Sequence, residues 1–529
     1  MTGTAALRTF AAAAIATIAA LAPSSPASAQ KVLRVVPHAD LKIVDPVQTA
    51  ALITRMHGLM VWDTLLAWDE QLVPKPQMVG DYSQSQDKLT WTFTLRPGLK
   101  FHDGKPVTTA DVIPSIKRWM VRDLIGQKLN EMTAAMEATD DRTFVLKLKE
   151  PYGFVEYSLG SSGGVIPVIM RAEDAATDPF KPVGTNIGSG PFKFVAADYV
   201  PGSKVAYVKN TDYVPRSEPP SGLAGGHVVK VDRLELVVIP DSSTVSAAIA
   251  KGEVDFWDTP PIDLIPTLEK NPDLTVQKVQ PLPWFFFLRP NTLFPPFNHP
   301  KAREALAYMV DQKDYLRASI GQEKWYRECF SFFVCGTPYG QETANAIRMP
   351  DLDKAKALMA EAGYKGEKVV LINATDIPSV NAVTLVTAER LKKIGVNVEV
   401  ISMDGGSFIS RWNVKNPPEQ GGWHLFHAFG SGSTWHHPLT NLGANLTCGG
   451  TNWAGWPCDE QAARLRDAVL RAPDRPAQVA AAQALQQRMW EAGPPYILNG
   501  QYDQPYVWRK NVTGVLPTGL LVFWNIAKD

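Results

Sequence analysis

The sequence lacks an excess of charge of either sign. Its 529 residues include 53 lysines and arginines and 53 aspartates and glutamates, which gives a formal net charge of +0 at pH 7. Proteins that bind nucleic acids concentrate positive charge to neutralise phosphates. The balanced charge therefore argues against a nucleic-acid partner and against steering of any highly charged polymer.

Long apolar runs are missing beyond the N-terminus. No later stretch reaches the ~18 apolar residues that a membrane-spanning helix requires. The apolar run from Phe10 to Leu21 follows Arg8 and precedes the small-residue site Ala27-Ser28-Ala29, which is the order of a cleaved export signal. We expect cleavage near Ala29 and export of the remaining chain. Lipid attachment is not expected, because the first cysteine is Cys329.

Sequence motifs of several enzyme classes are absent. There is no H-E-x-x-H zinc motif, no phosphate-binding G-x-x-x-x-G-K-[ST] loop and no G-x-G-x-x-G fingerprint after a strand. Residues 160–164, GSSGG, formally satisfy the hydrolase pattern G-x-S-x-G. That pattern needs a strand before the serine and an uninterrupted helix after it, and Pro167 occupies the place of this helix. We expect no catalysis and no cofactor; an exported hydrolase acting through Ser162 is an alternative.

Cysteine is scarce, and the four cysteines form two close pairs, Cys329 with Cys335 and Cys448 with Cys458. Spacings of six and ten positions do not give the C-x-x-C motif of zinc or redox sites. An exported protein can oxidise its thiols, and pairing of neighbours is the simplest of three connectivities. We therefore expect the disulfides Cys329–Cys335 and Cys448–Cys458.

The segment from Leu89 to Trp119 is the most informative feature that the sequence contains. Apolar residues alternate with threonines over residues 90–95, which predicts a half-buried strand. Asp103-Gly104 suits a tight turn, because glycine readily adopts a positive φ. Thr108, followed by Asp111, predicts a capped helix start. The segment therefore predicts a strand, a reversal and a helix in that order.

This segment resembles the signature of the peptide/nickel-type (family 5) extracytoplasmic solute-binding proteins of ABC transporters, and especially of their dipeptide- and oligopeptide-binding members. The family pattern runs roughly F-x-L-R-x-G-x-x-F-x-D-G-x-P-x-x-A-x-D-V. The matching residues are Phe93, Leu95, Arg96, Gly98, Phe101, Asp103, Gly104, Pro106, Asp111 and Val112. Further family elements occur at 188–191 (GSGP), 252–255 (GEVD) and 354–363 (KAKALMAEAG), so the resemblance spans nearly the whole mature chain.

The resemblance implies an α/β fold, periplasmic-binding-protein-like of type II. Two lobes are joined by a hinge, and an extra subdomain is inserted in the first lobe. The segment from Trp284 to Leu288 would carry the chain from the first lobe into the second. The expected division is a signal peptide at 1–29, lobe I at 30–60, 187–283 and 501–529, the inserted subdomain at 61–186, and lobe II at 284–500.

The same resemblance implies an extracytoplasmic solute-binding component of an ABC importer, located in the periplasm. The expected partners are a small solute, peptide-like or another small polar compound, and a membrane permease with its ATPase complex. We expect a monomer whose lobes close on the solute, because contacts from both lobes are satisfied together only in a closed form.

The ligand is harder to assign from the sequence. Dipeptide-binding members of the family carry an arginine for the ligand carboxylate in the segment equivalent to 374–378, and an aspartate for its ammonium in that equivalent to 430–438. Here the first segment offers only Asp376 as a charged group, and the second, GSGSTWHHP, has no acid. An unpaired buried charge is costly, so a neutral, polar or cationic molecule is favoured, with Asp376 as the partner of a cation. The residues expected to line the cleft are His38, Asp40, Trp284, Phe286, Asp376, Trp423, Thr434, Trp435 and His436.

Four histidines, His424, His427, His436 and His437, lie within fourteen positions. Imidazole is the commonest transition-metal ligand in proteins. A nickel or metal-chelate carrier with His436 and His437 as ligands is therefore an alternative function. A strand over 423–428 would point His424 and His427 to opposite faces, so our main interpretation includes no metal.

Overall fold

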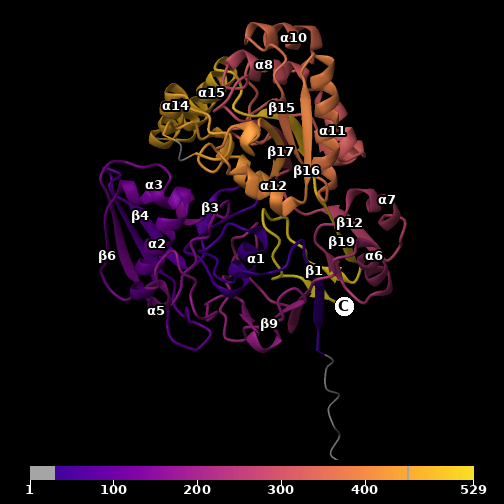
Figure 1. Ribbon diagram of the computed structural model, residues 1–529. Helices are drawn as coiled ribbons and strands as arrows, with labels where there is room; N and C mark the ends of the chain where they lie inside the picture. Colours follow the sequence, from indigo (N-terminus) through magenta and orange to yellow (C-terminus); the bar gives the residue numbers. More distant parts are fainter. Residues whose placement is uncertain (1–29, 450–451, 473) are drawn as a thin grey trace, which may run out of the picture.

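The computed structural model describes residues 30–449, 452–472 and 474–529, and the expected signal peptide lies outside these ranges. The described chain forms two lobes, each built around its own sheet (Figure 1). Among the described residues, no helix has the length and apolar character needed to cross a membrane. The predicted two-lobed α/β architecture is confirmed.

The first lobe is built on a seven-stranded mixed sheet. At its centre, β1 (Val32–Val36) pairs in parallel with two strands that follow much later in the sequence. Leu33 and Val35 of β1 are fully buried, as is typical of strands that pair in parallel on both sides. In spatial order the strands are β12 (Leu274–Lys278), β19 (Pro505–Arg509), β11 (Phe256–Trp257), β1, β10 (Arg233–Val237), β9 (Lys204–Lys209) and β8 (Phe192–Phe194).

The second lobe is built on a six-stranded sheet. Its central strand β13 (Trp284–Pro290) runs antiparallel to both of its neighbours, and Phe285 pairs with Gly430. In spatial order the strands are β14 (Tyr326–Arg327), β18 (Ile497–Tyr502), β13, β17 (Leu425–Gly430), β15 (Val369–Ala374) and β16 (Val398–Met403).

A third, four-stranded sheet lies between β1 and β8 in the sequence. Its order is β4 (Val79–Gln84), β5 (Thr90–Leu95), β7 (Thr143–Leu148) and β6 (Thr133–Ala138). Side chains of β5 alternate between half-buried and buried, as predicted. Helix α2 (Thr109–Arg122) follows the turn, and a reciprocal capping box joins Thr108 and Asp111 at its start. The predicted strand–turn–helix unit is therefore confirmed, and Trp119 of the helix is fully buried.

Helices cover the sheets of both lobes (Figure 1). Those of the first lobe and its insertion, besides α2, are α1 (Leu52–Val61), α3 (Leu124–Met132), α4 (Val155–Leu159), α5 (Ala172–Ala175), α6 (Ser242–Lys251) and α7 (Ile265–Leu268). Those of the second lobe are α8 (Pro300–Met309), α9 (Gln312–Ser319), α10 (Leu352–Glu361), α11 (Pro378–Lys393), α12 (Gly405–Trp412), α13 (Gly432–Trp435), α14 (Glu460–Arg471) and α15 (Arg475–Glu491). The remaining strands form two small pairs, β2 (Leu66–Trp68) with β3 (Pro74–Pro76), and β20 (Val512–Thr513) with β21 (Ala527–Lys528).

The chain passes between the lobes at two places. It leaves the first sheet at Lys278 and enters the second at Trp284; it leaves the second at Tyr502 and rejoins the first at Pro505. Both expected disulfides, Cys329–Cys335 and Cys448–Cys458, are present and lie in the second lobe.

Candidate functional site

A cavity of ≈ 270 Å³ lies between the two lobes. The second lobe supplies most of its wall from β13, β17, α12, α13 and the loops that follow, and the first lobe contributes one side chain from α1. The lining residues are Arg55, Trp284, Phe287, Trp412, Ala428, Phe429, Gly430, Ser431, Thr434, Trp435, Leu442 and Trp453. The wall is thus rich in aromatic rings and holds one cation and no carboxylate.

Arg55 is the single lining residue from the first lobe. It belongs to the largely apolar helix α1 and is only 5% exposed. Its Nη1 donates to the carbonyl of Ser162 at 2.7 Å, while its Nε is buried without a hydrogen-bond partner. Burial lowers the pKa of Arg55 to about 10, and the charge of Asp123 opposes this shift. Arg55 therefore remains a cation at neutral pH.

Sequence reasoning did not identify Arg55, although a usable signal was present. The helix reads LITRMHGLMV, and nine of its ten residues are buried, including the arginine. A charged residue inside an otherwise apolar helix is seldom buried without a purpose. That contrast could have identified Arg55 as a candidate site residue. The sequence does not show, however, which elements of the second lobe it would face.

The aromatic wall is held rigidly by ring packing within the second lobe. Trp435 stacks on Phe285 with ring centroids 5.7 Å apart, and it lies 4.4 Å from Phe287 and 5.0 Å from Tyr496. A Cβ added to Gly430 would lie 1.7 Å from the Nε1 of Trp435. Only glycine at position 430 therefore lets the indole approach the strand this closely.

Trp284 lines the cavity at the start of β13. Its ring meets Phe429 edge-on at 5.6 Å and stacks on Tyr502 at 6.3 Å. The indole nitrogens of Trp284 and Trp412 are both buried without a hydrogen-bond partner. With the Nε of Arg55, the lining residues thus carry three buried donors that nothing in the described protein satisfies.

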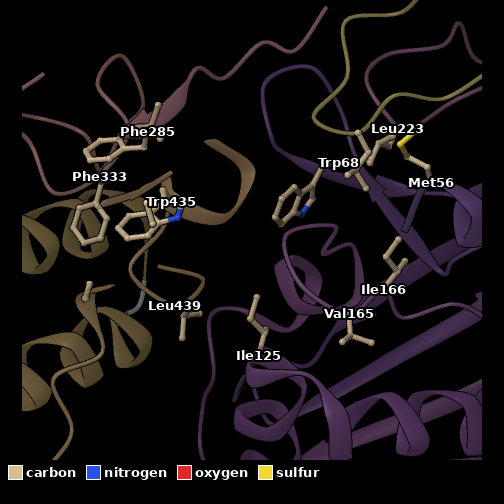
Figure 2. Close-up of a cluster of buried hydrophobic side chains, with 14 of the residues drawn as sticks. Met56, Trp68, Ile125, Val165, Ile166, Leu223, Phe285, Phe333, Trp435 and Leu439 are labelled. Carbon is tan, nitrogen blue, oxygen red and sulfur yellow. The ribbon is translucent and has the colours of Figure 1, made fainter. Parts of the chain in front are cut away.

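The lobes touch beside this cavity. Thr434 Oγ1 donates to the carbonyl of Gly163 at 3.0 Å, and the hydroxyl of Tyr157 lies 3.1 Å from Nε2 of His436. Trp68 meets the ring of His436 edge-on at 5.5 Å. Figure 2 shows the apolar side chains on either side of this contact, Phe285, Phe333, Trp435 and Leu439 from the second lobe and Trp68, Ile125, Val165 and Ile166 from the first. The described conformation is a closed one.

The histidines do not form an open cluster of ligands. His436 Nδ1 lies 2.9 Å from the carbonyl of Ser433, and its Nε2 faces Tyr157, so both ring nitrogens are engaged. Nδ1 of His437 accepts from the backbone of Leu439. No group of three or more histidine, cysteine, aspartate or glutamate side chains poised for a metal occurs in the described part of the chain. The geometry of the two adjacent histidines thus does not favour the metal-carrier alternative.

Three of the residues expected in the cleft line the cavity: Trp284, Thr434 and Trp435. His436 lies beside it in the contact between the lobes. Phe286 does not line the cavity. Like Trp284 it packs on Phe429 and Tyr502, with ring centroids 5.9 Å and 4.7 Å away, and it is buried. Side chains alternate along β13, so Trp284 and Phe286 share one face, and Phe285 and Phe287 pack on Trp435 from the other.

The remaining expected residues lie elsewhere. Trp423 is fully buried in the second lobe, against Phe426. Asp376 is exposed just after β15. His38 is paired with Asp258 at 2.5 Å, and Asp40 accepts from the backbone of Gly202 at 2.9 Å, so both are engaged within the first lobe. None of these four residues lines the cavity.

Ser162, the residue of the hydrolase alternative, has no nucleophile-elbow context in the structure. Helix α4 precedes it, and the next helix, α5, begins ten residues later at Ala172. Its carbonyl, not its hydroxyl, takes part in the site, because that carbonyl holds Arg55.

Comparison with known families places the chain clearly. The model of the bacterial extracellular solute-binding proteins, family 5 (middle region), matches residues 73–453. A curated protein from Sinorhizobium fredii (strain NBRC 101917 / NGR234), described as a probable peptide ABC transporter periplasmic-binding protein, is 39% identical over 493 residues, 92% of each chain. The glutathione-binding protein GsiB of Pectobacterium atrosepticum is 27% identical over 423 residues, 78% of this chain and 76% of GsiB.

Solved structures agree on the fold. The dipeptide-binding protein of Pseudoalteromonas sp. SM9913, in complex with Met-Leu, superposes with a TM-score of 0.78 at 19% identity, covering 94% of this chain and 100% of the other. The binding protein AgaA of A. tumefaciens R10, in complex with agropinic acid, gives a TM-score of 0.76 at 24% identity, covering 94% and 99%. The fold is therefore that of the type II periplasmic binding proteins, as expected.

Proposed function

Because the chain belongs to the bacterial extracellular solute-binding proteins of family 5, we propose that it captures a small organic solute in the cavity between its lobes. It then delivers this solute to the permease of an ABC import system. The observation that carries the proposal is the cavity itself, whose wall combines Arg55 of one lobe with Trp284 and Trp435 of the other. A site made from two lobes is complete only when they close.

The solute we propose is peptide-like or another small organic compound. The description of the 39% identical relative as a peptide transporter component supports this class. The volume of ≈ 270 Å³ lies just below the ~300–1,000 Å³ usual for small-molecule pockets, which suits a compact solute. A largely aromatic wall with a few polar groups is typical of small-molecule sites.

The proposed mechanism is a hinge that closes on the solute. The two crossings, at residues 279–283 and 503–504, are the proposed hinge. Free protein opens at these segments, and the solute favours closure because only the closed form offers contacts from both lobes. To shift the balance from mostly open to mostly closed, the solute needs about 5 kcal/mol of differential affinity. The closed surface is what the permease recognises.

We further propose that the protein acts in the periplasm, as a monomer, after cleavage of an export signal near Ala29 and without a lipid anchor. The description of the 39% identical relative as a periplasmic-binding protein supports the location. We propose no catalytic step, because Ser162 contributes a carbonyl to the site and lacks the elbow that would activate its hydroxyl.

The test combines a binding screen with solution scattering. Dipeptides, tripeptides, glutathione and N-acylated amino acids are screened by thermal unfolding, since a ligand at 100 times its Kd adds about 2.7 kcal/mol of stability. A stabilising compound should also reduce the radius of gyration. Trp284→Leu should remove both effects, and Trp423→Phe, in the core of the second lobe, should keep them. Consumption of a compound, or one rigid shape with and without it, would contradict the proposal.

A further inference from the structure

Residues that line the cavity carry buried hydrogen-bond donors without acceptors. Nε of Arg55 and Nε1 of Trp284 and Trp412 are buried, and within the described residues each lacks a hydrogen-bond partner. The hydroxyls of the wall, on Ser431 and Thr434, are hydrogen-bonded to each other at 3.1 Å. Buried polar groups in native proteins are nearly always paired. Arg55 is the one charged side chain among the lining residues, and the carbonyl of Ser162 engages one of its three guanidinium nitrogens. The acceptor for this cation is therefore expected to come from the bound solute.

A carboxylate is the group that fits this set of donors. A guanidinium offers a planar fork that matches a carboxylate, and hydrogen bonds between charged groups are the strong ones. The wall carries one positive charge, from Arg55. A phosphate, with about −1.5 to −2 charges, would leave excess negative charge in an aromatic cavity, which is unfavourable.

The cavity offers no anionic partner for an ammonium group, because no carboxylate lines it. Asp123 is a buried acid whose charge acts to raise the pKa of Arg55. Its two carboxylate oxygens accept hydrogen bonds from the backbone N–H groups of Ile125, Gly126 and Val165. Burial raises the pKa of Asp123 to about 6, against the effect of these bonds. Asp123 faces a separate small cavity and already accepts three backbone hydrogen bonds.

One loop holds the side chain of Arg55 and also makes the contact between the lobes. The carbonyl of Ser162 holds Nη1 of Arg55, and the carbonyl of the next residue, Gly163, accepts from Thr434 of the other lobe. A Cβ on Gly163 would lie 2.9 Å from the carbonyl of Ser433, so the close approach requires glycine there. Two adjacent residues thus fix the orientation of the Arg55 guanidinium and the contact between the closed lobes.

We propose that the solute is a small organic acid whose carboxylate is bound by Arg55. Its apolar or planar body lies against Trp284 and Trp435, and it has no free ammonium group that requires a partner. N-acylated amino acids and comparable acids have this chemistry. The inference rests on the proposed function and names the solute class for the same cavity.

The test uses matched pairs that differ in one charge. The probes are N-benzoylglycine with N-benzoylglycinamide, N-acetylphenylalanine with its amide, and Ala-Phe with N-acetyl-Ala-Phe, each offered separately at the same concentrations and measured by titration calorimetry. The proteins are the wild type, Arg55→Gln, Arg55→Lys and the surface control Arg464→Gln, whose residue pairs only with exposed Glu460. Circular dichroism and thermal unfolding establish that each variant is folded.

The expected result is binding of the acids over their amides, and of the N-acetylated peptide at least as well as the free one. Arg55→Gln should weaken binding of the acids about 10- to 100-fold, with Arg55→Lys intermediate and Arg464→Gln unchanged. If Arg55→Gln does not fold, the inference is tested by the wild type alone, which should bind each acid more tightly than its amide. Equal binding of acid and amide, preference for a free ammonium, or no effect of Arg55→Gln overturns this inference alone. Binding of no probe overturns it too, whereas the proposed function fails only if the wider screen and scattering also show nothing.

Discussion

The hydroxyl of Tyr157 in the first lobe lies 3.1 Å from Nε2 of His436 in the second. Because Nδ1 of His436 faces the carbonyl of Ser433 at 2.9 Å, that nitrogen carries the proton. Nε2 is then an acceptor, and the tyrosine donates. The two lobes are thus joined by a directional hydrogen bond that is fully buried on both sides.

Removal of this hydroxyl should weaken closure. In Tyr157→Phe, Nε2 of His436 loses its donor, and a buried hydrogen bond contributes about 1 kcal/mol net. We expect roughly fivefold weaker apparent affinity for a solute that induces closure, measured by titration calorimetry.

Tyr364→Phe is the control for this prediction, because its hydroxyl bonds only within the second lobe, to Glu367 and Asn397. It should leave solute affinity unchanged. Equal losses of affinity in both variants would contradict a closing role for Tyr157.

Acidification should destabilise the protein partly through His436. Burial lowers the pKa of this histidine to about 4, while its bonds to the carbonyls of Ser433 and Gly432 oppose the shift. The unfolded chain, with an ordinary pKa near ~6.5, binds the proton first as pH falls. Stability from this group is therefore complete above about pH 6.5 and decreases by up to ~1.4 kcal/mol per pH unit down to about pH 4.

The pH dependence is measured by comparing wild type with His436→Gln. His57, His102 and His424 also have pKa values lowered to about 4 by burial, so both proteins lose stability on acidification. The variant should have a shallower slope between pH 6.5 and 4 in urea unfolding. Parallel curves would show that His436 is not held neutral in the folded protein.

Trp284→Phe should reduce solute binding without reducing stability. Phenylalanine keeps the ring contacts with Phe429 and Tyr502, and the lost Nε1 has no partner in the protein. If the solute accepts a hydrogen bond from this nitrogen, affinity should fall about fivefold, for about 1 kcal/mol. Thermal unfolding of the free variant serves as the check, and a large drop in its midpoint would show that Nε1 has a structural role instead.

The disulfide Cys448–Cys458 should support the cavity as well as the fold. Trp453, which lines the cavity, lies inside the loop that it closes. In the chain-entropy account, a loop of this length contributes roughly 2.7 kcal/mol. Replacement of both cysteines by serine should lower stability by about this amount and also weaken solute binding.

The matched control for this prediction is the serine pair at Cys329 and Cys335, whose separation is 6 positions. It should lower stability by about 2 kcal/mol and leave solute affinity in place, because neither cysteine lines the cavity. Titration calorimetry of both variants measures the solute affinities that this prediction compares. Unchanged solute affinity after replacement of Cys448 and Cys458 would show that this disulfide does not position Trp453 for binding.

Local patterns were sufficient for several elements. The alternation over 90–95 and the Thr108–Asp111 cap predicted β5 and α2 correctly, because strand periodicity and capping depend on near neighbours in the chain. The two disulfides were predicted from short spacings for the same reason. Trp423, by contrast, was expected in the cleft and lies in the core, because aromatic residues serve both environments equally well.

By itself, the sequence determined the lobes' building units, the family signature and the paired cysteines, all of which depend on residues a few positions apart. Only the tertiary structure decided where the solute is bound. It places Arg55 of α1 in the same cavity wall as Trp284 and Trp435, which lie more than two hundred positions further along the chain. No local periodicity encodes such a meeting, because it depends on how two separately folded lobes close on one another.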